Sequence, residues 1–423
     1  MSNAADIDIS RPTRTTEFEK RLKKRYRAER NFKLMGQGAI VFSVAVLIFL
    51  LGNMLSNGIG GFQRAELEVP INFAESGLTG DDVSLSAPSA VQVLEMQGMS
   101  EVVHFYAEEA LGKDGADQLS DQAWRDVAAA LTSDPSLIEN SEPMTFYLPA
   151  SSDLASGLAG EGSPEMQALA KELAAQGKLG ENWDWGFLSR SDATSPQAVG
   201  IWGALKGSIL TMLVTLVLAF PIGMLAALYL EEYAPRNRWT DLIEVSINNL
   251  AAVPSIIFGL LGLAVFLAIF PNLRSAPLIG GMTLALMTMP VIVISGRNAI
   301  KAVPPSIRDG ALAVGASPIQ VVFHHVLPLA LPGMLTGTII GMARALGETA
   351  PLLLIGMRAF VATPPADLTS PATVLPVQIF LWSDEIDRGF VERTSAAIVV
   401  LLLFLLVMNS IAIYLRNKFE KTW

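Results

Sequence analysis

Residues 205–230 read LKGSILTMLVTLVLAFPIGMLAALYL, and Lys206 is the only charged side chain among them. The uncharged part is at least as long as the roughly 20 residues that a helix needs to cross a lipid bilayer. Hydrophobic residues make up 51% of the chain, and they gather into several runs of this kind. A soluble protein of this length would instead divide into two or three domains. The sequence therefore predicts an all-α polytopic membrane protein.

Five further apolar runs bring the predicted number of transmembrane helices to six. They lie at about Met35–Leu55, Leu250–Phe270, Leu278–Ile294, Gly333–Gly356 and Ala396–Leu415. Six spans return the C-terminus to the side of the membrane on which the chain begins. Basic residues cluster in the loops expected on that side, and the positive-inside rule then places both termini in the cytoplasm.

The beginning of the chain is polar and basic before it becomes apolar. Residues 1–34 form a predicted cytoplasmic tail, rich in lysine and arginine toward its end, and residues 35–56 form the first predicted transmembrane helix. A secretory signal peptide shares this order, but it ends in a small-residue cleavage site. No such site follows clearly here, and the basic region is long, which favours a retained helix.

Residues 57–200 carry most of the negative charge, and we refer to them as the acidic domain. They contain 6 Lys/Arg and 23 Asp/Glu, a balance of −17, so the remainder of the chain, whose total is −10, carries +7. We expect this domain outside the cytoplasm, between the first two spans. Such charge is typical of a solvated surface, and docking to another protein is the alternative function.

The acidic domain is predicted to be a small α+β fold and not a disordered loop. Apolar and polar residues alternate from Ala65 to Phe73, as in a half-buried strand. Ser163 and Pro164 provide an N-cap and a first-turn proline for a helix that Gly177 would end. Two further short helices are expected, at Val102–Gly112 and Ser120–Leu131.

Several classes of chemistry are excluded by composition. The chain has no cysteine, and its three histidines have no partners at metal-ligand spacing. No G-x-x-x-x-G-K-[S/T] phosphate loop is present, so ATP and its Mg²⁺, if they drive this protein, bind to another chain. The spans hold no nucleophile–base pair or metal cluster. We therefore expect no cofactor, no metal, no nucleic-acid partner and no enzymatic activity on this chain itself.

The loop between the fourth and fifth spans, residues 298–330, has the pattern of a helical hairpin. Ser317 and Pro318 form an N-cap and first-turn pair, and Gly315 lies where the turn between two short helices needs a residue without a side chain. Apolar residues then recur at i, i+3, i+4 and i+7, which predicts one apolar face: Ile319, Val322, Phe323 and Val326. Such a hairpin either fits a groove on a soluble partner or lies on the lipid surface.

The same loop, RDGALAVGASPIQVVFHHVLPLALPG, resembles the cytoplasmic signature of ABC importer permeases: E-A-A, three residues, Gly, nine residues, then I-x-L-P. The matching positions are Asp309, Ala311, Gly315, Leu327 and Pro328. Gly310 replaces the first alanine, and His325 replaces the aliphatic residue. Because Asp309 keeps the negative charge, the resemblance still implies that this coupling loop docks onto an ATPase subunit.

Residues 343–356, ARALGETAPLLLIG, resemble the fifth span of the PstA-type permeases, which are the phosphate-importing members of this family. Similar segments extend from about Trp185 to the C-terminus, and the acidic domain looks like the extension found in a subset of these permeases. The resemblance implies the six-span type I importer fold, residence in the bacterial inner membrane and import of inorganic phosphate. It also implies the partners: a homologous PstC-like permease, a dimer of PstB-like ATPase subunits, an extracytoplasmic PstS-like phosphate-binding protein and the lipid bilayer.

Charged residues within the apolar runs are the candidate substrate pathway. Arg344 and Glu348 are four residues apart, hence on one face of a predicted helix, and opposite charges at this spacing offset one another. They are either a buried ion pair that fixes helix packing or part of the path of an anion. Arg297, at the end of the fourth span, is a further candidate. Arginine suits phosphate because its planar fork donates two hydrogen bonds at once.

Two alternatives remain at this stage. A permease for another oxyanion, sulfate or molybdate, would share the coupling loop, and only the segment around Glu348 argues against it. A membrane receptor or scaffold, with the acidic domain as its sensory part, is the alternative from a different class. Copurification of ATPase subunits would separate transport from the second alternative.

Overall fold

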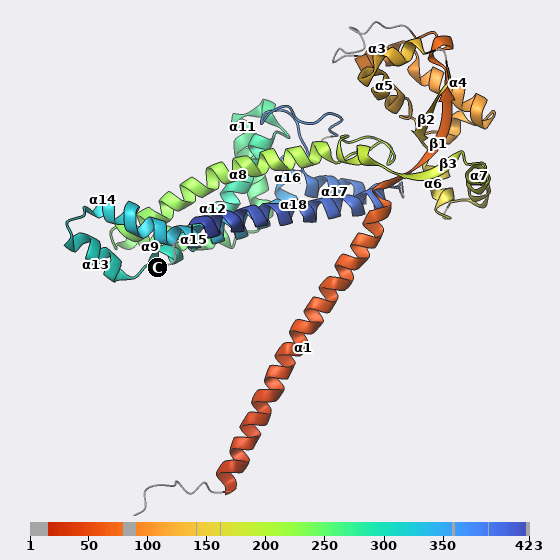
Figure 1. Ribbon diagram of the computed structural model, residues 1–423. Coiled ribbons are helices and arrows are strands. Elements are labelled where there is room, and N and C mark those ends of the chain that lie inside the picture. The colour runs from red at the N-terminus through yellow and green to blue at the C-terminus, as the bar shows by residue number, and fades with distance from the viewer. Residues whose placement is uncertain are drawn as a thin grey trace, which may run out of the picture. The chain divides into compact units, whose positions relative to one another are not determined.

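The computed structural model describes residues 16–78, 90–140, 142–160, 162–357, 360–387 and 389–419 (Figure 1). The chain forms two compact units that divide between Ser56 and Asn57. Helix α1 (Thr16–Gly60) is the described part of the first unit and crosses this division. It runs unbroken from the basic tail through the apolar run because lysine, arginine, glutamate and leucine all have high helix propensity.

A three-stranded antiparallel sheet forms the base of the acidic domain. Its order is β2 (Met144–Pro149), β1 (Gln63–Ile71) and β3 (Leu179–Trp183), with β1 in the centre. The alternation predicted from Ala65 is confirmed, because every second side chain of β1 is buried in the domain core. The register pairs Leu67 with Leu148 on one side and with Leu179 on the other.

The described part of the acidic domain also contains five α-helices: α3 (Ala90–Met96), α4 (Met99–Leu111), α5 (Trp124–Ser133), α6 (Ser152–Leu158) and α7 (Pro164–Ala175). The predicted cap of α7 is confirmed, since the Ser163 hydroxyl accepts from the Met166 amide, and Gly177 follows the helix with a φ of +74°. Helix α5 begins four residues later than expected, because Ser120–Ala123 form a turn first.

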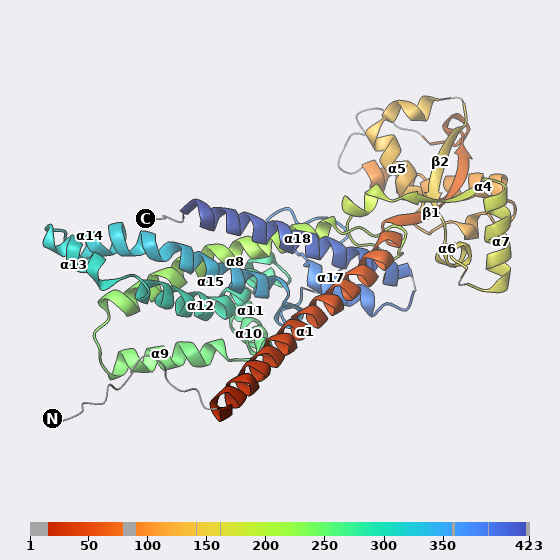
Figure 2. The same ribbon diagram turned by 60° about the horizontal axis from the view of Figure 1, so that its bottom comes forward.

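Four long helices of residues 201–423, which we call the core, run alongside one another (Figures 1 and 2). They are α8 (Trp202–Leu228), α12 (Pro277–Lys301), α15 (Leu327–Leu346) and α18 (Gly389–Phe419). Helix α12 packs against α8 and α15 through glycines: a Cβ on Gly281 would meet Val214, and one on Gly337 would meet Ser295. Small residues of this kind let membrane helices approach closely.

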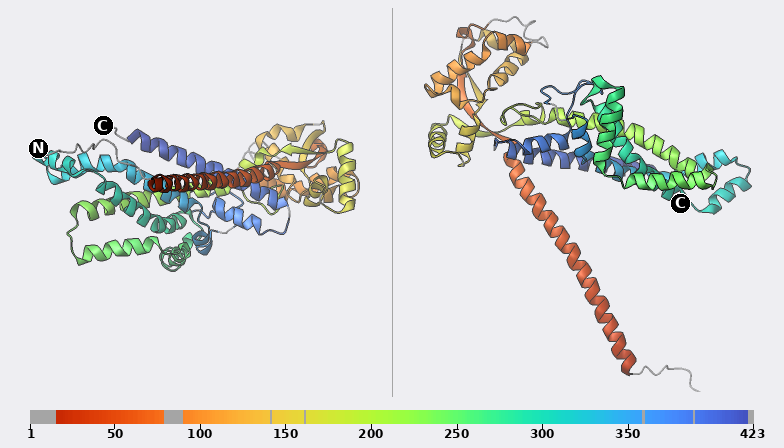
Figure 3. Two further views of the ribbon diagram at one scale, coloured as in Figure 1. Left: turned by 90° about the horizontal axis from the view of Figure 1, so that it is seen from below. Right: turned by 180° about the vertical axis from the view of Figure 1, so that it is seen from behind.

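The prediction of several transmembrane helices is confirmed, with two corrections to their geometry. Among the described residues, five helices are long and apolar enough to cross a membrane, or up to six if a bent pair is counted as one span. That pair corrects the bounds of the span predicted at Leu250–Phe270: α9 (Arg238–Ala251) meets the segment Ser255–Ile269 at 104°. Figures 2 and 3 show the second arm crossing the direction of the long helices. Pro254 at the break disfavours helical backbone in the residue before it.

The fifth predicted span, Gly333–Gly356, is also corrected. Its helix α15 begins earlier and ends at Leu346, and a separate short helix, α16 (Ala350–Leu354), follows. The break contains Gly347, and Pro351 cannot donate a backbone hydrogen bond to continue α15. By contrast, Pro221 and Pro290 lie inside helices that continue through them, so these two prolines do not break their spans.

Candidate functional site

The candidate pair Arg344–Glu348 lies where α15 gives way to α16. Arg344 is in the last turn of α15, Glu348 follows the helix cap at Gly347, and Arg344 Nε is 3.5 Å from Glu348 Oε1. The two residues are therefore neighbours, although they do not share a continuous helical face. The Arg344 side chain is 50% exposed, and no other charged partner reaches it among the residues that the structure describes.

The neighbours of Arg344 in sequence show why its side chain projects outward. Ala345 and Leu346 are buried in the core cluster that also contains Leu284 and Leu352. This packing fixes the end of α15 against α12 and α16. The guanidinium is left with one long contact, so most of its N–H groups are available to a ligand. An arginine held on a rigid backbone with free donors is suited to bind an oxyanion.

Arg297 does not belong to the same place as Arg344. Helices α12 and α15 run antiparallel, and a Cβ added to Gly341 would touch Thr288. Arg344 lies three residues after Gly341 on α15, and Arg297 lies nine residues after Thr288 on α12. Because the helices are antiparallel, the two arginines lie on opposite sides of this contact. At 1.5 Å per helical residue the two arginines are about 18 Å apart along the core. The structure therefore separates two residues that the sequence suggested could share one path.

Arg297 belongs instead to a network of ion pairs at the end of the core that carries the coupling loop, which we call the hairpin end. Its guanidinium is 3.3 Å from Glu231 Oε2 and 2.9 Å from Glu244 Oε2. Lys301 also reaches Glu231, at 3.6 Å. Both carboxylates lie within the reach of Arg297, so its charge is neutralised. This arrangement favours a structural role for Arg297 over contact with a passing anion.

A second ion pair at the hairpin end joins the coupling loop to α8. Arg308 Nη2 is 2.8 Å from Glu232 Oε1, and both side chains are largely buried. Glu231 and Glu232 lie in a π-helix, η5 (Tyr229–Tyr233), that continues α8. This network was not predicted from the sequence, in which the available signal is the pair of adjacent glutamates directly after an apolar run.

The coupling loop is the helical hairpin that the sequence predicts. It consists of α13 (Pro305–Ala313), α14 (Pro318–Gln320) and the π-helix η8 (Val321–Val326). Gly315 turns the chain with a φ of +88°, which only glycine adopts easily. Ser317 forms a capping box with Gln320, in which each side chain bonds to the other residue's backbone amide.

The residues of the signature have different environments in this hairpin. Asp309, Gly310 and Gly315 are exposed, Ala311 is buried, and Leu327 and Pro328 are partly buried in the first turn of α15. The signature therefore spans both the outer surface of the hairpin and its junction with the core. Its exposed positions are available to a partner, and the buried ones fix the hairpin to α15.

The predicted apolar face of the hairpin is only half right. Val322 and Val326 are buried, but Ile319 and Phe323 are 63% and 44% exposed. The prediction assumed 3.6 residues per turn, whereas η8 is a π-helix with wider turns, so the four residues do not align on one face. The exposed pair joins Leu312 and Val314 in what we call the hairpin patch: Leu312, Val314, Ile319 and Phe323.

A buried arginine at the opposite end of the core was also missed. Arg393, near the start of α18, is 4% exposed and donates to the carbonyls of Pro196 and Gly61, each at 2.8 Å, and to Asp184 Oδ2 at 2.9 Å. Arg190 shares the same Asp184 oxygen, at 2.6 Å. One arginine thus ties both ends of the acidic domain to the last helix of the core.

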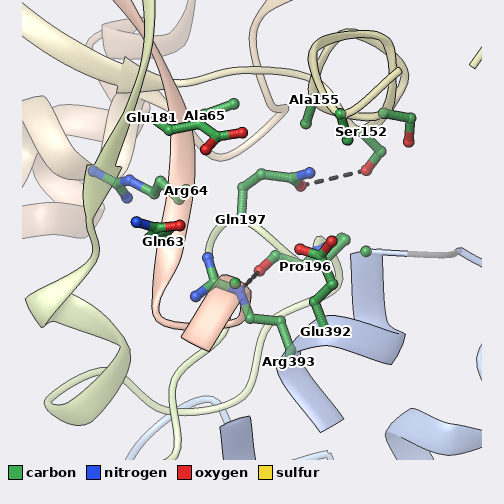
Figure 4. Close-up of a pocket in the computed structure, with 14 residues that line it drawn as sticks. Gln63, Arg64, Ala65, Ser152, Ala155, Glu181, Pro196, Gln197, Glu392 and Arg393 are labelled. Carbon is green, nitrogen blue, oxygen red and sulfur yellow. Dashed lines mark hydrogen bonds between the residues drawn. The ribbon is translucent and has the colours of Figure 1, made fainter. Parts of the chain in front are cut away.

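Above Arg393 lies a polar cavity of about 140 Å³ between the acidic domain and the start of α18 (Figure 4). Gln197 extends across it and accepts a hydrogen bond from the Ser152 hydroxyl at 3.3 Å. Arg393, which also lines the cavity, uses one N–H on each of its three nitrogens to hold Pro196, Gly61 and Asp184. No group of three or more residues that could hold a metal ion occurs in the described part of the chain.

Comparison with known proteins identifies the class to which this architecture belongs. A family model described as "Binding-protein-dependent transport system inner membrane component" matches residues 219–421, and one described as "Domain of unknown function (DUF3333)" matches residues 19–168. The probable ABC transporter permease protein YqgI of Bacillus subtilis is 30% identical, over 56% of this chain and 84% of its own length. The chain therefore belongs to the permease subunits of ABC importers.

Within this family the chain is similar to the phosphate permeases. The phosphate transport system permease protein PstA of Yersinia pestis is 32% identical to it, over 52% of this chain and 74% of its own length. Among solved structures, inward-facing conformations of the MetNI methionine ABC transporter align over 52% of this chain and 98% of that chain, with 19% identity and a TM-score of 0.43. The resemblance to PstA-like permeases that the sequence suggested is confirmed.

Proposed function

We propose that this chain is a permease subunit of an ATP-driven importer of inorganic phosphate. It forms half of the transmembrane pathway and pairs with a PstC-like permease. Its coupling hairpin docks onto a dimer of PstB-like ATPase subunits, which bind ATP and Mg²⁺, while a PstS-like protein delivers phosphate from outside. Both termini then lie in the cytoplasm, and the acidic domain lies outside.

The observation that carries this proposal is the state of Arg344. Its guanidinium is half-exposed and keeps most of its donors free, although it lies at the end of an apolar helix. Intramembrane ionisable residues are expensive and mark substrate pathways often enough to make this the default hypothesis. Glu348, at 3.5 Å, offsets the charge of Arg344 without occupying most of its N–H donors. A phosphate that arrives from the binding protein would displace this long contact and bind Arg344 bidentately.

The hairpin patch supports the coupling part of the proposal. Four large apolar side chains are exposed at the hairpin end, on a rigid helical hairpin with a negative charge at Asp309. Such a surface fits a groove on a soluble partner. The charge of Arg297 is neutralised by Glu231 and Glu244. We therefore assign Arg297 a structural role and leave Arg344 and Glu348 as the proposed pathway residues.

A permease for sulfate or molybdate, and a receptor with an acidic sensory domain, are the alternatives that the test must separate. Cells deleted for this chain are complemented with wild type, Arg344→Gln or Arg344→Lys at matched membrane expression. Uptake of radiolabelled phosphate at low micromolar concentration is measured with and without excess sulfate. Arg274→Gln, which alters another exposed arginine of the core, is the matched control.

We expect wild type to restore phosphate uptake that sulfate does not inhibit. Arg344→Gln should abolish uptake, Arg344→Lys should restore part of it, and the control should remain near wild type. Inhibition by sulfate would transfer the assignment to another oxyanion. No uptake of either anion, with ATPase subunits absent from the purified protein, would favour the receptor.

A further inference from the structure

The contacts of Arg308 set it apart from the other charged residues at the hairpin end. Its Nε and Nη2 both donate to Glu232 Oε1, at 3.2 and 2.8 Å. Its Nη1 donates to the Val303 carbonyl at 2.7 Å, and Nη2 also reaches the Ile300 carbonyl at 3.0 Å. One side chain thus joins the hairpin helix α13, the end of α12 and the end of α8.

The π-helix η5 makes this joint possible. Glu231 and Glu232 are adjacent, so their side chains point in different directions around the helix. Glu231 faces α12, where it contacts Arg297 and Lys301, while Glu232 faces the hairpin. A π-turn adds a residue to the helix and is found frequently at functional sites.

The charges of this network balance, and its two branches are distinct. Three acids, Glu231, Glu232 and Glu244, meet three bases, Arg297, Lys301 and Arg308. The Arg308–Glu232 branch includes the hairpin, whereas the branch through Glu244 joins α9 to α12 only. Arginine forms a rigid joint because its planar fork fixes the direction of several hydrogen bonds at once.

We propose that the Arg308–Glu232 pair transmits the movement of the coupling hairpin to α8, and that both are positioning residues for transport. This inference rests on the proposed function, in which ATP-driven closure of the ATPase dimer moves the hairpin. Helix α8 carries that movement along the core toward the opposite end, where it packs on α12 through Gly281. Without the pair, the hairpin moves but the spans do not follow fully.

The first test compares two isosteric substitutions that each remove one acid from one branch. The complete complex is reconstituted in proteoliposomes, and phosphate transported per ATP hydrolysed is measured for Glu232→Gln and Glu244→Gln. Glu232→Gln should lower this ratio about five- to tenfold with the ATPase subunits still bound, while Glu244→Gln stays within about twofold of wild type. An unchanged ratio for Glu232→Gln, or an equal loss in both variants, overturns the proposal.

A second variant covers the case in which Glu232→Gln fails to assemble. Arg308→Lys keeps the charge, but a lysine cannot reach Glu232 and both carbonyls in fixed directions. It should therefore lower the ratio in the same way, with ATP hydrolysis retained. Wild-type coupling in Arg308→Lys would show that a positive charge alone suffices. This would contradict the proposal that the directed hydrogen bonds of the guanidinium connect the hairpin to α8.

The second test does not depend on the identity of the substrate. The chain has no cysteine, so cysteines introduced at Ser306 in the hairpin and Ile222 in α8 are the only positions on it that take a spin label. In wild type the distance between the labels should be the same without nucleotide and with ATP trapped, because hairpin and helix move together. In Glu232→Gln the two states should give different distances.

The outcomes of the two tests separate the proposals. If the wild-type complex transports no phosphate, the proposed function fails, and the spin-label distances still decide the role of the pair. If wild type transports phosphate but its labels already change distance between the two states, the proposed function stands and the joint is refuted.

Discussion

At the scale of single residues, the charged groups of this chain divide into those that are neutralised and those that are not. At the hairpin end Arg297 and Arg308 each contact a carboxylate closely. Arg344 has one carboxylate at 3.5 Å and is half-exposed. The sequence shows where these arginines are, but the distinction between them depends on partners far away in the chain, such as Glu232 for Arg308. Residue types alone therefore located the candidates without ranking them.

Asp192 offers a test of the junction between the acidic domain and the core. Its Oδ1 accepts from Trp382 Nε1 at 3.1 Å and from the Ala193 amide at 3.1 Å. Burial raises the pKa of this carboxyl above its ordinary value, although these hydrogen bonds oppose the shift. The folded state then holds the proton more tightly than the unfolded chain. Ionisation of Asp192 consequently lowers stability as the pH rises above about 3.9, the unfolded value.

Asp192→Asn removes that charge and keeps an oxygen that accepts from Trp382. The purified variant should show a higher apparent Tm than wild type at pH 7.5, and the difference should vanish as the pH falls to about 4 and below. Thermal scans at one fixed rate across this pH range check the expectation. A lower Tm for the variant at pH 7.5 would mean that the ionised carboxylate is stabilised by a charged partner.

At the scale of elements, the sequence predicted local features such as caps and turns better than it predicted the contacts between elements. The cap at Ser163, the turn at Gly315 and the alternation of β1 are properties of neighbouring residues, and all three are confirmed. Prolines within the apolar runs indicate that a helix bends or breaks, as it does at the 104° break before Ser255, but they do not show which helices continue through a proline. Pro290 lies inside a continuous helix, whereas Pro254 stands at a break, and the surrounding packing decides between them.

The contact between α12 and α15 should depend on glycine. A Cβ on Gly337 would collide with the Ser295 side chain, whereas one on Gly310 in α13 would meet nothing within 4 Å. Gly337→Leu should therefore destabilise the core by about 1–3 kcal/mol through overpacking. Gly310→Ala, as the control, should be neutral or stabilising by up to about 1 kcal/mol because alanine favours the helix. Thermal unfolding of the two purified variants measures both effects.

Equal stability of Gly337→Leu and wild type would show that α12 and α15 do not approach as closely as described. A destabilised Gly310→Ala would instead indicate that α13 is packed by another part of the chain. Gly310 also occupies the first alanine position of the coupling signature, so its replacement by alanine should leave transport intact.

The hairpin patch makes a prediction about assembly. Val314 is 85% exposed, so Val314→Asp leaves the fold unchanged but places a charge in an apolar surface. We expect the ATPase subunits to be lost from the purified complex, because an apolar contact cannot accommodate an unpaired carboxylate. Ile386→Asp is the matched control, since Ile386 is 98% exposed and lies in the segment just before α18, at the opposite end of the core. Retention of the ATPase by Val314→Asp would exclude the patch as the docking surface.

At the scale of the whole molecule, the sequence predicted the class of fold and the family, and the structure adds how the parts are joined. Arg393 binds Asp184, 209 residues away, and Gly61, 332 residues away. No periodicity or motif encodes such a contact, because it depends on how distant segments fold back on one another. The same reason explains why the Arg308–Glu232 pair, 76 residues apart, was not foreseen.

The domain boundaries at residues 34, 56 and 200 remain predictions. The structural division falls between Ser56 and Asn57, while the two matched family segments cover residues 19–168 and 219–421. The role of the acidic domain is likewise a proposal. Arg393 attaches this domain to α18, the last helix of the core.

In the proposed function, this chain conducts phosphate inward at the expense of ATP hydrolysed by its partners. The most direct measurement is accumulation of radiolabelled phosphate in proteoliposomes that contain the chain, its permease partner and the ATPase subunits, with ATP inside and the loaded binding protein outside. We predict accumulation that requires both ATP and the binding protein and that is lost with Arg344→Gln. Accumulation without ATP, or none when all partners are assembled, would contradict ATP-driven import of phosphate by this chain.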